Sequence, residues 1–276
     1  MTSNIFDVNV DLCTGCQLCV IACKDEHVSA PRPPWADQQS ETGQFWIRID
    51  TIEAGPTPRV QVAHLPVMCQ HCHNAPCITV CPEGAIKRRP DGLVWIDPET
   101  CNGCGLCEAA CPYDVIYPNA ELGIAQKCTG CAQRIDEDLQ PRCVEMCPHD
   151  ALTFTDAAER DDEPNPTGEV FHPEYLTEPR VGWSGLPAVS IAGRLLNNTG
   201  SDVVIGATVL VQDLAVDATY QVESDAFGEF RWKGEGVGHS FLVTVSQEGQ
   251  VRTRQVVTGK LGVDLGTVNL PEYEGQ

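Results

Sequence analysis

The sequence predicts an α+β protein with a cysteine-rich N-terminal half and an all-β C-terminal half. All 16 cysteines lie before residue 148 and fall into four blocks of four, with none left over. Three of the blocks close on a Cys-Pro pair followed by an apolar, strand-like segment, so this half carries an internal repeat. The remainder contains no cysteine, and short β-like segments alternate there with turns. A chain of 276 residues is long enough for two domains.

Each repeat is predicted to contain a strand, a cysteine loop, a short helix and a second strand. Pro82, Pro112 and Pro148 follow the last cysteine of their blocks. Proline fixes its own φ and lacks a backbone N–H, so it ends the helical turn that carries that cysteine. Asp91-Gly92 is typical of a hairpin turn, and the apolar residues 93–96 after it predict a strand. The unit occurs four times, which gives two ferredoxin-like pairs.

Two segments interrupt this pattern. Residues 24–68 separate the first two blocks, and residues 45–49 with 60–62 predict an inserted hairpin there. Residues 155–187 are rich in acidic residues and proline, so we expect an irregular linker laid across a surface.

Residues 188–276 are predicted to form a β-sandwich, because short strands recur at close spacing with turn residues between them. The seven expected strands are residues 189–193, 207–211, 219–222, 229–232, 241–245, 254–257 and 266–270.

The cysteine spacing predicts cubane iron–sulfur clusters. A [4Fe-4S] cluster takes one thiolate per iron, so 16 cysteines provide for four clusters. The first and third blocks have the C-x2-C-x2-C-x3-C spacing of paired-cluster ferredoxins, in which the fourth cysteine ligates the other cluster. The second and fourth blocks have a larger loop before the third cysteine. Zinc is the alternative ligand, but zinc sites usually combine two separated C-x2-C pairs, which fits four near-complete quartets poorly.

Composition narrows the remaining classes. The formal charge of −21 opposes binding to nucleic acid or anionic lipid. No apolar run approaches the roughly 20 residues of a membrane span, and the first residues lack the features of a secretory signal. Cluster assembly needs reduced thiols, so we expect a cytoplasmic protein.

No second constellation points to catalysis. His64, His71, His73 and His149 lie near the cysteine blocks, and we interpret them as donors that tune a cluster rather than as ligands. Phosphate loops, paired carboxylates and activated nucleophiles are not evident, so we expect no active site on this chain.

The order and spacing of the four blocks resemble the four-cluster iron–sulfur subunits of the dimethyl-sulfoxide-reductase family of molybdopterin oxidoreductases. The resemblance covers residues 5–155 and implies that the first block pairs with the fourth and the second with the third. It implies the following ligand sets: cluster 1, Cys13, Cys16, Cys19 and Cys147; cluster 2, Cys23, Cys128, Cys131 and Cys143; cluster 3, Cys69, Cys72, Cys77 and Cys111; cluster 4, Cys81, Cys101, Cys104 and Cys107. It further implies a large catalytic partner chain that carries a molybdopterin guanine dinucleotide with Mo or W next to cluster 1.

A narrower likeness covers nearly the whole chain. Residues 66–77, 125–131 and 225–230 are similar to small subunits of pyrogallol–phloroglucinol transhydroxylases, which end in an immunoglobulin-like or transthyretin-like domain. Those subunits lack one cluster because their third block is degenerate, whereas Cys101, Cys104 and Cys107 are all present here. The intact block favours net electron exchange with an outside donor such as ferredoxin or flavodoxin.

Three functions follow from these features. The first is the electron-transfer subunit of an anaerobic, heterodimeric molybdopterin enzyme that acts on a hydroxylated aromatic as a transhydroxylase, phenol hydroxylase or reductive dehydroxylase. The second is the equivalent subunit of a formate dehydrogenase or reductase, and the third is a free polyferredoxin. In each case we expect a polyferredoxin-like domain at residues 1–154, a linker at 155–187 and a sandwich at 188–276.

Overall fold

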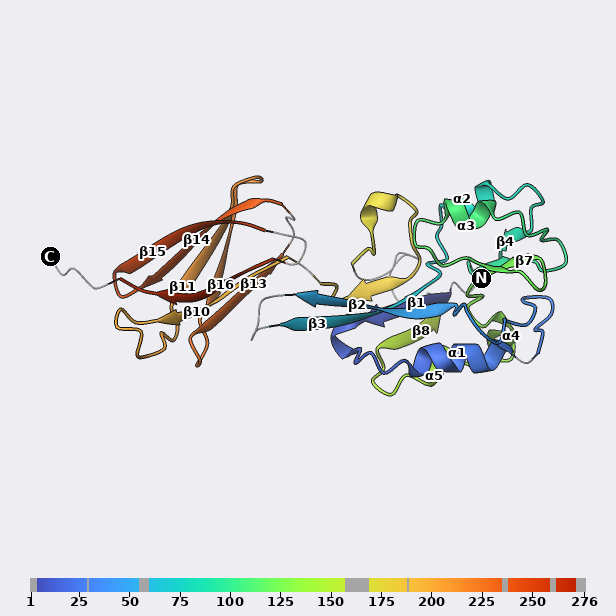
Figure 1. The fold of residues 1–276 in the computed structure, drawn as a ribbon, viewed down its shortest axis with the longest axis horizontal. Coiled ribbons are helices and arrows are strands. Elements are labelled where there is room, and N and C mark those ends of the chain that lie inside the picture. Colours follow the sequence, from blue (N-terminus) through green and yellow to red (C-terminus); the bar gives the residue numbers. More distant parts are fainter. Residues whose placement is uncertain are drawn as a thin grey trace. The chain divides into compact units, whose positions relative to one another are not determined.

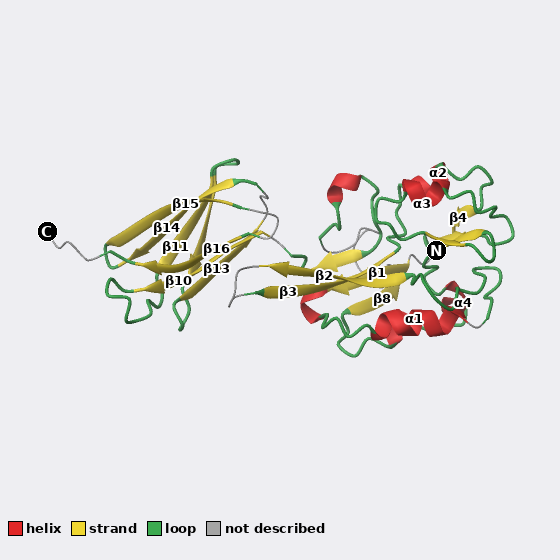
Figure 2. Cartoon of the chain, in the orientation of Figure 1, coloured by secondary structure: helices red, strands yellow, loops and turns green. Residues whose placement is uncertain are grey.

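A computed structural model describes residues 4–28, 30–54, 60–156, 169–187, 189–234, 238–258 and 262–271. The chain divides into two units (Figure 1). The first, called the cysteine unit, consists of Met1–Ile52 and Ala63–Leu186 and contains every cysteine. The second, called the β unit, consists of Glu53–Val62 and Pro187–Gln276. All helices of the described residues belong to the cysteine unit (Figure 2).

The cysteine unit contains a three-stranded sheet in the order β8-β1-β9. β1 (Asn4–Asn9) pairs antiparallel with β8 (Leu152–Asp156) and parallel with β9 (Gly182–Ser184). Phe6 lies opposite Phe154 in this register, and their ring centroids are 4.6 Å apart. The sheet therefore joins the segment before the first cysteine block to the segment after the last one.

Short elements connect the cysteine loops. The helices are α1 (Leu18–Val28), α2 (Pro76–Thr79), α3 (Leu106–Ala110), α4 (Ala132–Ile135) and α5 (Arg142–Glu145), with 3-10 turns η1 (Val10–Leu12) and η3 (Pro173–Tyr175). The two-stranded sheets are β2 (Ile47–Ala54) with β3 (Gln61–Met68), β4 (Ile86–Arg88) with β5 (Val94–Ile96), and β6 (Tyr117–Asn119) with β7 (Ile124–Gln126). The β2–β3 hairpin lies in the segment between the first two blocks, and its strands extend beyond the residues predicted for them. α1 packs against α5 and α2 against α3, which brings the first block to the fourth and the second to the third.

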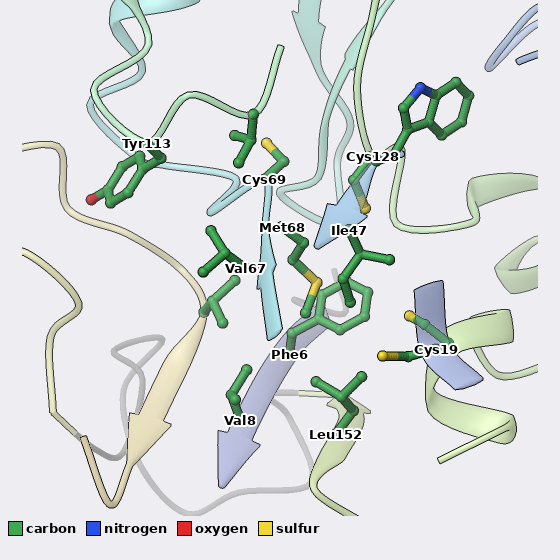
Figure 3. Close-up of a cluster of buried hydrophobic side chains, with 14 of the residues drawn as sticks. Phe6, Val8, Cys19, Ile47, Val67, Met68, Cys69, Tyr113, Cys128 and Leu152 are labelled. Carbon is green, nitrogen blue, oxygen red and sulfur yellow. The ribbon is translucent and has the colours of Figure 1, made fainter. Parts of the chain in front are cut away.

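A continuous hydrophobic cluster fills the cysteine unit. Figure 3 shows Phe6 and Leu152 beside Ile47 and Met68, with side chains of the cysteine blocks at the edge of this cluster. Met68 is fully buried, and the next residue, Cys69, already belongs to the second block. The apolar core thus continues directly into the cysteine loops and fixes where their thiols point.

The segment after β8 differs from the expected irregular linker. Residues 169–186 belong to the cysteine unit and contribute β9 to its sheet. Phe171, Val181 and Trp183 are buried, and the rings of Phe171 and Trp183 stack at 4.4 Å. Isolated apolar residues in a polar segment carry little periodicity, so the sequence did not reveal this packing. The acidic, proline-rich centre of the expected linker, residues 161–166, lies outside the described residues.

The β unit contains two sheets that share one hydrophobic cluster. One sheet has the order β13-β10-β16 and the other β12-β11-β14-β15. The strands are β10 (Val189–Leu196), β11 (Thr208–Asp213), β12 (Ala218–Glu223), β13 (Glu229–Gly234), β14 (Ser240–Gln247), β15 (Gln250–Val257) and β16 (Val263–Asn269). Side chains alternate between buried and more exposed positions along β11, β13 and β14, as strands with one buried face do. The prediction of a mostly β C-terminal region is confirmed, with a described strand at each of the seven expected places.

Candidate metal centres

The four cysteine loops share one backbone feature. The residue before the second cysteine of each block has a positive φ: +69° at Gly15, +45° at His71, +67° at Gly103 and +71° at Gly130. Glycine adopts this conformation freely, whereas a residue with a Cβ pays about 1–2 kcal/mol. The common turn indicates that one local geometry is used four times, with histidine in place of glycine in the second block.

This turn directs backbone N–H groups toward the first sulfur of a block. Gly130 donates its N–H to Cys128 Sγ at 3.3 Å, and His71 donates its N–H to Cys69 Sγ at 3.4 Å. Such donors favour the thiolate over the thiol, because they stabilise negative charge on sulfur. The loops are therefore built to present sulfur as an anion.

One cavity is lined by cysteines of the first and fourth blocks. It contains Cys13, Cys16 and Cys19 together with Cys147, and Ile49 and His149 also line it. A second cavity contains Cys101, Cys104 and Cys107 of the third block together with Cys81 of the second. Each cavity therefore brings together three cysteines of one block and the last cysteine of another.

The remaining eight cysteines form two more buried groups. Burial raises the pKa of Cys23 well above its ordinary value, and negative charge on Cys131, Cys128 and Cys143 raises it further. Cys23 therefore lies close to the first three cysteines of the fourth block.

A similar group surrounds Cys72. Burial raises the pKa of this thiol to about 12, and Cys69, Cys77 and Cys111 act in the same direction. The structure thus groups all 16 cysteines into quartets, which we number sites 1 to 4 in the order of the ligand sets given above.

Neighbouring sites adjoin one another in a row. Cys19 of site 1 raises the pKa of Cys143 of site 2, after burial and two closer cysteines. Burial and then Cys69 of site 3 raise the pKa of Cys128 of site 2 to about 12.

Sites 3 and 4 are linked in the same way. Burial raises the pKa of Cys77 to about 12, and Cys107 of site 4 is among the thiols that add to it. The order of the sites is therefore 1-2-3-4.

The donor set fits an iron–sulfur cluster. Buried thiolates that repel one another are stable only beside positive charge, which a cluster core provides. Within the described residues, no three histidine, cysteine or carboxylate side chains converge closely enough to hold a single metal ion. Ligands of a cubane stand further apart than those of one ion, because each of them binds a different iron.

Buried polar atoms near the quartets also fit such a group. His71 Nε2 and Thr129 Oγ1 lie inside cysteine blocks, and neither has a hydrogen-bond partner among the described residues. His27 Nε2 lies 3.7 Å from Cys131 Sγ, and burial lowers the pKa of His27 to about 3, so the ring is neutral. These groups are placed to donate to sulfur.

The histidines singled out in the sequence occupy different positions. His71 accepts a hydrogen bond from Val94 N–H at 3.0 Å, and His149 lines the cavity of site 1. His64 packs its ring over Gly15 of the first block rather than over the second block, and Thr51 Oγ1 lies 3.1 Å from its Nδ1. His73 is exposed.

Sequence reasoning did not single out His27 or Lys127. His27 lies 104 residues from Cys131 in the chain, so no local motif announces their contact. Lys127 directly precedes the fourth block, and nothing in its neighbours predicts that its side chain turns inward. The only signal was a charged residue after two residues of a short strand.

Known proteins agree with these centres. Residues 60–157 match the family model of a 4Fe-4S dicluster domain, and residues 10–26 match that of a 4Fe-4S binding domain. The pyrogallol hydroxytransferase small subunit of Pelobacter acidigallici is 32% identical over 95% of this chain and 97% of that protein. A sulfite dehydrogenase subunit of Allochromatium vinosum is 36% identical, covering 65% of this chain and 81% of that one. A putative dimethyl sulfoxide reductase iron-sulfur subunit of Halobacterium salinarum is 34% identical, covering 64% and 73%.

These matches define a class of iron–sulfur proteins. The chain belongs to the family of iron–sulfur electron-transfer subunits of molybdopterin oxidoreductases, as its cysteine spacing predicted. Its cofactors are [4Fe-4S] clusters, and the molybdenum cofactor resides on the partner subunit. No helix of the described residues is both long and apolar enough to cross a bilayer.

Proposed function

We propose that the chain relays electrons through four [4Fe-4S] clusters between a catalytic large subunit and an outside donor or acceptor. The supporting observation is the row of four cysteine quartets, in which each site adjoins the next. When bound, the clusters supply one-electron redox centres. The ligands are those of sites 1 to 4: Cys13, Cys16, Cys19, Cys147; Cys23, Cys128, Cys131, Cys143; Cys69, Cys72, Cys77, Cys111; and Cys81, Cys101, Cys104, Cys107.

The exposure of the cysteines supports the direction of this relay. Cys16 of site 1 and Cys104 of site 4 are exposed, while the other 14 cysteines are buried or partly buried. The row therefore reaches the surface at its two ends. We assign the site 1 end to the large molybdopterin subunit and the site 4 end to a donor such as ferredoxin or flavodoxin, in a cytoplasmic setting.

The substrate class follows from the relative that matches nearly the full chain. That protein is named for a hydroxyl transfer involving pyrogallol. We propose a hydroxylated aromatic as the substrate and, because the third block is intact, a reaction with net electron exchange. The purified complex should then remove a catechol hydroxyl only when a low-potential donor is added. Hydroxyl exchange between two phenols without any donor would contradict this proposal.

A second candidate rests on the sulfite dehydrogenase and dimethyl sulfoxide reductase relatives. Under this alternative the chain serves a formate dehydrogenase or reductase with a different substrate. A free polyferredoxin is the third possibility. Size-exclusion chromatography of the native protein separates these cases, because a co-purifying large chain with molybdopterin rules out the free carrier.

We also propose the finer architecture. Residues 1–154 would form two bis-[4Fe-4S] ferredoxin-like modules, one around sites 1 and 2 and one around sites 3 and 4. Residues 188–276 would form an immunoglobulin-like or transthyretin-like sandwich, with 155–187 between the two domains. The cross-packing of α1 with α5 and of α2 with α3 supports the two modules, and the shared core of the two β sheets supports the sandwich.

A further inference from the structure

Lys127 is the only lysine or arginine that is buried in the described part of the chain, with 2% of its surface exposed. It forms no ion pair with a carboxylate among those residues. A buried cation without a counter-ion is costly relative to an apolar side chain, so stability alone does not account for it. Such a residue marks a place where a local rule is broken for function.

Three acceptors surround the ammonium group. Nζ donates to the carbonyl oxygen of Val94, to the carbonyl oxygen of Cys128 at 3.0 Å and to Cys69 Sγ at 3.3 Å. An ammonium has three N–H donors, whereas a neutral amine has two. The contacts therefore use every proton of the charged form.

The position of this charge is specific. Cys69 is a ligand of site 3 in the proposed function, and Cys128 is a ligand of site 2. Val94 lies on β5 and also donates its N–H to His71, so the same residue is fixed from both sides. Lys127 thus stands at the junction between the two halves of the row.

We propose that Lys127 is a fixed positive charge that raises the reduction potentials of the two inner clusters. The inference rests on the proposed function, since it needs clusters at sites 2 and 3. Reduction adds an electron to a centre that is already anionic, and a nearby buried cation stabilises the more negative state. Its effect is strongest at site 3, where it touches the ligand sulfur itself. The charge favours an electron on the buried inner pair over the exposed ends of the row.

The test compares Lys127→Met with the unchanged protein in an anaerobic potentiometric titration of the purified complex, followed by electron paramagnetic resonance. We expect the midpoint potential of the site 3 cluster to fall, that of site 2 to fall by less, and those of sites 1 and 4 to stay nearly constant. A merely structural lysine would not produce this graded, site-selective shift. Four intact clusters with unchanged potentials in Lys127→Met would overturn the inference.

Lys24 provides a matched control. It directly follows Cys23 of site 2 and donates to the carbonyl of Gln44 at 2.8 Å, but it is only partly buried. Water screens its charge, so Lys24→Met should shift the site 2 potential much less than Lys127→Met does. An equal shift would contradict the role assigned to the buried charge.

Two further variants keep the test decisive if Lys127→Met fails to load. Lys127→Gln removes the charge and retains two donors, while Lys127→Arg retains the charge. Loss of clusters from both neutral variants but not from Lys127→Arg would support the need for a cation. Loss from all three would overturn the inference in favour of a packing role. Fewer than four clusters in the unchanged protein would instead refute the proposed function, so the two failures are distinct.

Discussion

In the β unit, strands of six to eight residues enclose one apolar core, whereas most elements of the cysteine unit are far shorter. α2 to α5 have four or five residues each, and β4 to β7 have three. Isolated helices below about 12 residues are marginal in water, and so are isolated two-stranded hairpins. The comparison indicates that the β unit is stabilised by burial of apolar surface, while the cysteine loops depend on ligation.

Removal of iron should separate the two units most strongly. If the iron is chelated anaerobically in the full chain, we expect residues 69–147 to lose protection against hydrogen exchange, because metal binding and folding of such loops are coupled. The strands of the β unit should keep their protection, since their core contains no cysteine. Hydrogen exchange followed by mass spectrometry measures both regions in one sample. Full protection of α3 after iron removal would contradict the comparison.

A single ligand change should give the next largest effect. Cys128→Ser removes a buried ligand at site 2 that also adjoins Cys69 of site 3. We expect the iron content to fall by roughly four atoms per chain or more, because one cubane holds four irons. Iron and sulfide assays of anaerobically purified protein provide the measurement.

Cys16→Ser is the matched change at an exposed end of the row. Its loss should be confined to the cluster at site 1, since Cys16 borders solvent rather than a second site. A full complement of iron in Cys128→Ser would contradict the assignment of this residue as a ligand.

Sequence predicted the two regions to different depths. In the cysteine unit, spacing was sufficient for the class of cofactor, because a cubane imposes close cysteine repeats on any chain that binds it. Alternation in β11 and β14 was sufficient for strands, because one buried face imposes a period of two. The cysteine spacing and the β alternation are both local patterns, and local patterns are visible in a sequence.

Contacts between distant residues were not visible. Trp183 donates its indole N–H to Gln70 Oε1 at 3.0 Å across 113 residues, and β9 has only three residues. The inward turn of Lys127 depends on a carbonyl of β5, 33 residues away. Each of these features arises from tertiary packing, which single-sequence patterns do not encode.

A core substitution tests the apolar side of the comparison. Trp232 is buried in the β unit, and its ring lies 5.1 Å from those of Tyr220 and Phe241. Trp232→Ala should lower the free energy of unfolding of the β unit by about 3–5 kcal/mol, through lost burial and a residual cavity. Thermal or urea unfolding of the cluster-loaded chain measures this change. The iron content should stay constant, and iron loss would contradict the independence of the two stabilising mechanisms.

Phe227 is the control for this change, because its side chain is 70% exposed in a turn of the same unit. Phe227→Ala should alter the free energy of unfolding by no more than about 0.5 kcal/mol, as is usual for exposed positions.

The smallest predicted effect concerns the turn that all four cysteine loops share. Gly103 has φ +67°, and a Cβ there would stand 2.3 Å from the carbonyl oxygen of Gly123. Gly105 has φ +76° with no atom within 4 Å of such a Cβ. Gly105→Ala should therefore cost only the left-handed backbone, about 1–2 kcal/mol, while Gly103→Ala adds a clash with main chain. The measurement is the rate at which site 4 loses iron to a chelator, which should increase more in Gly103→Ala. Equal rates in the two variants would show that backbone conformation alone, and not the contact with Gly123, limits this loop.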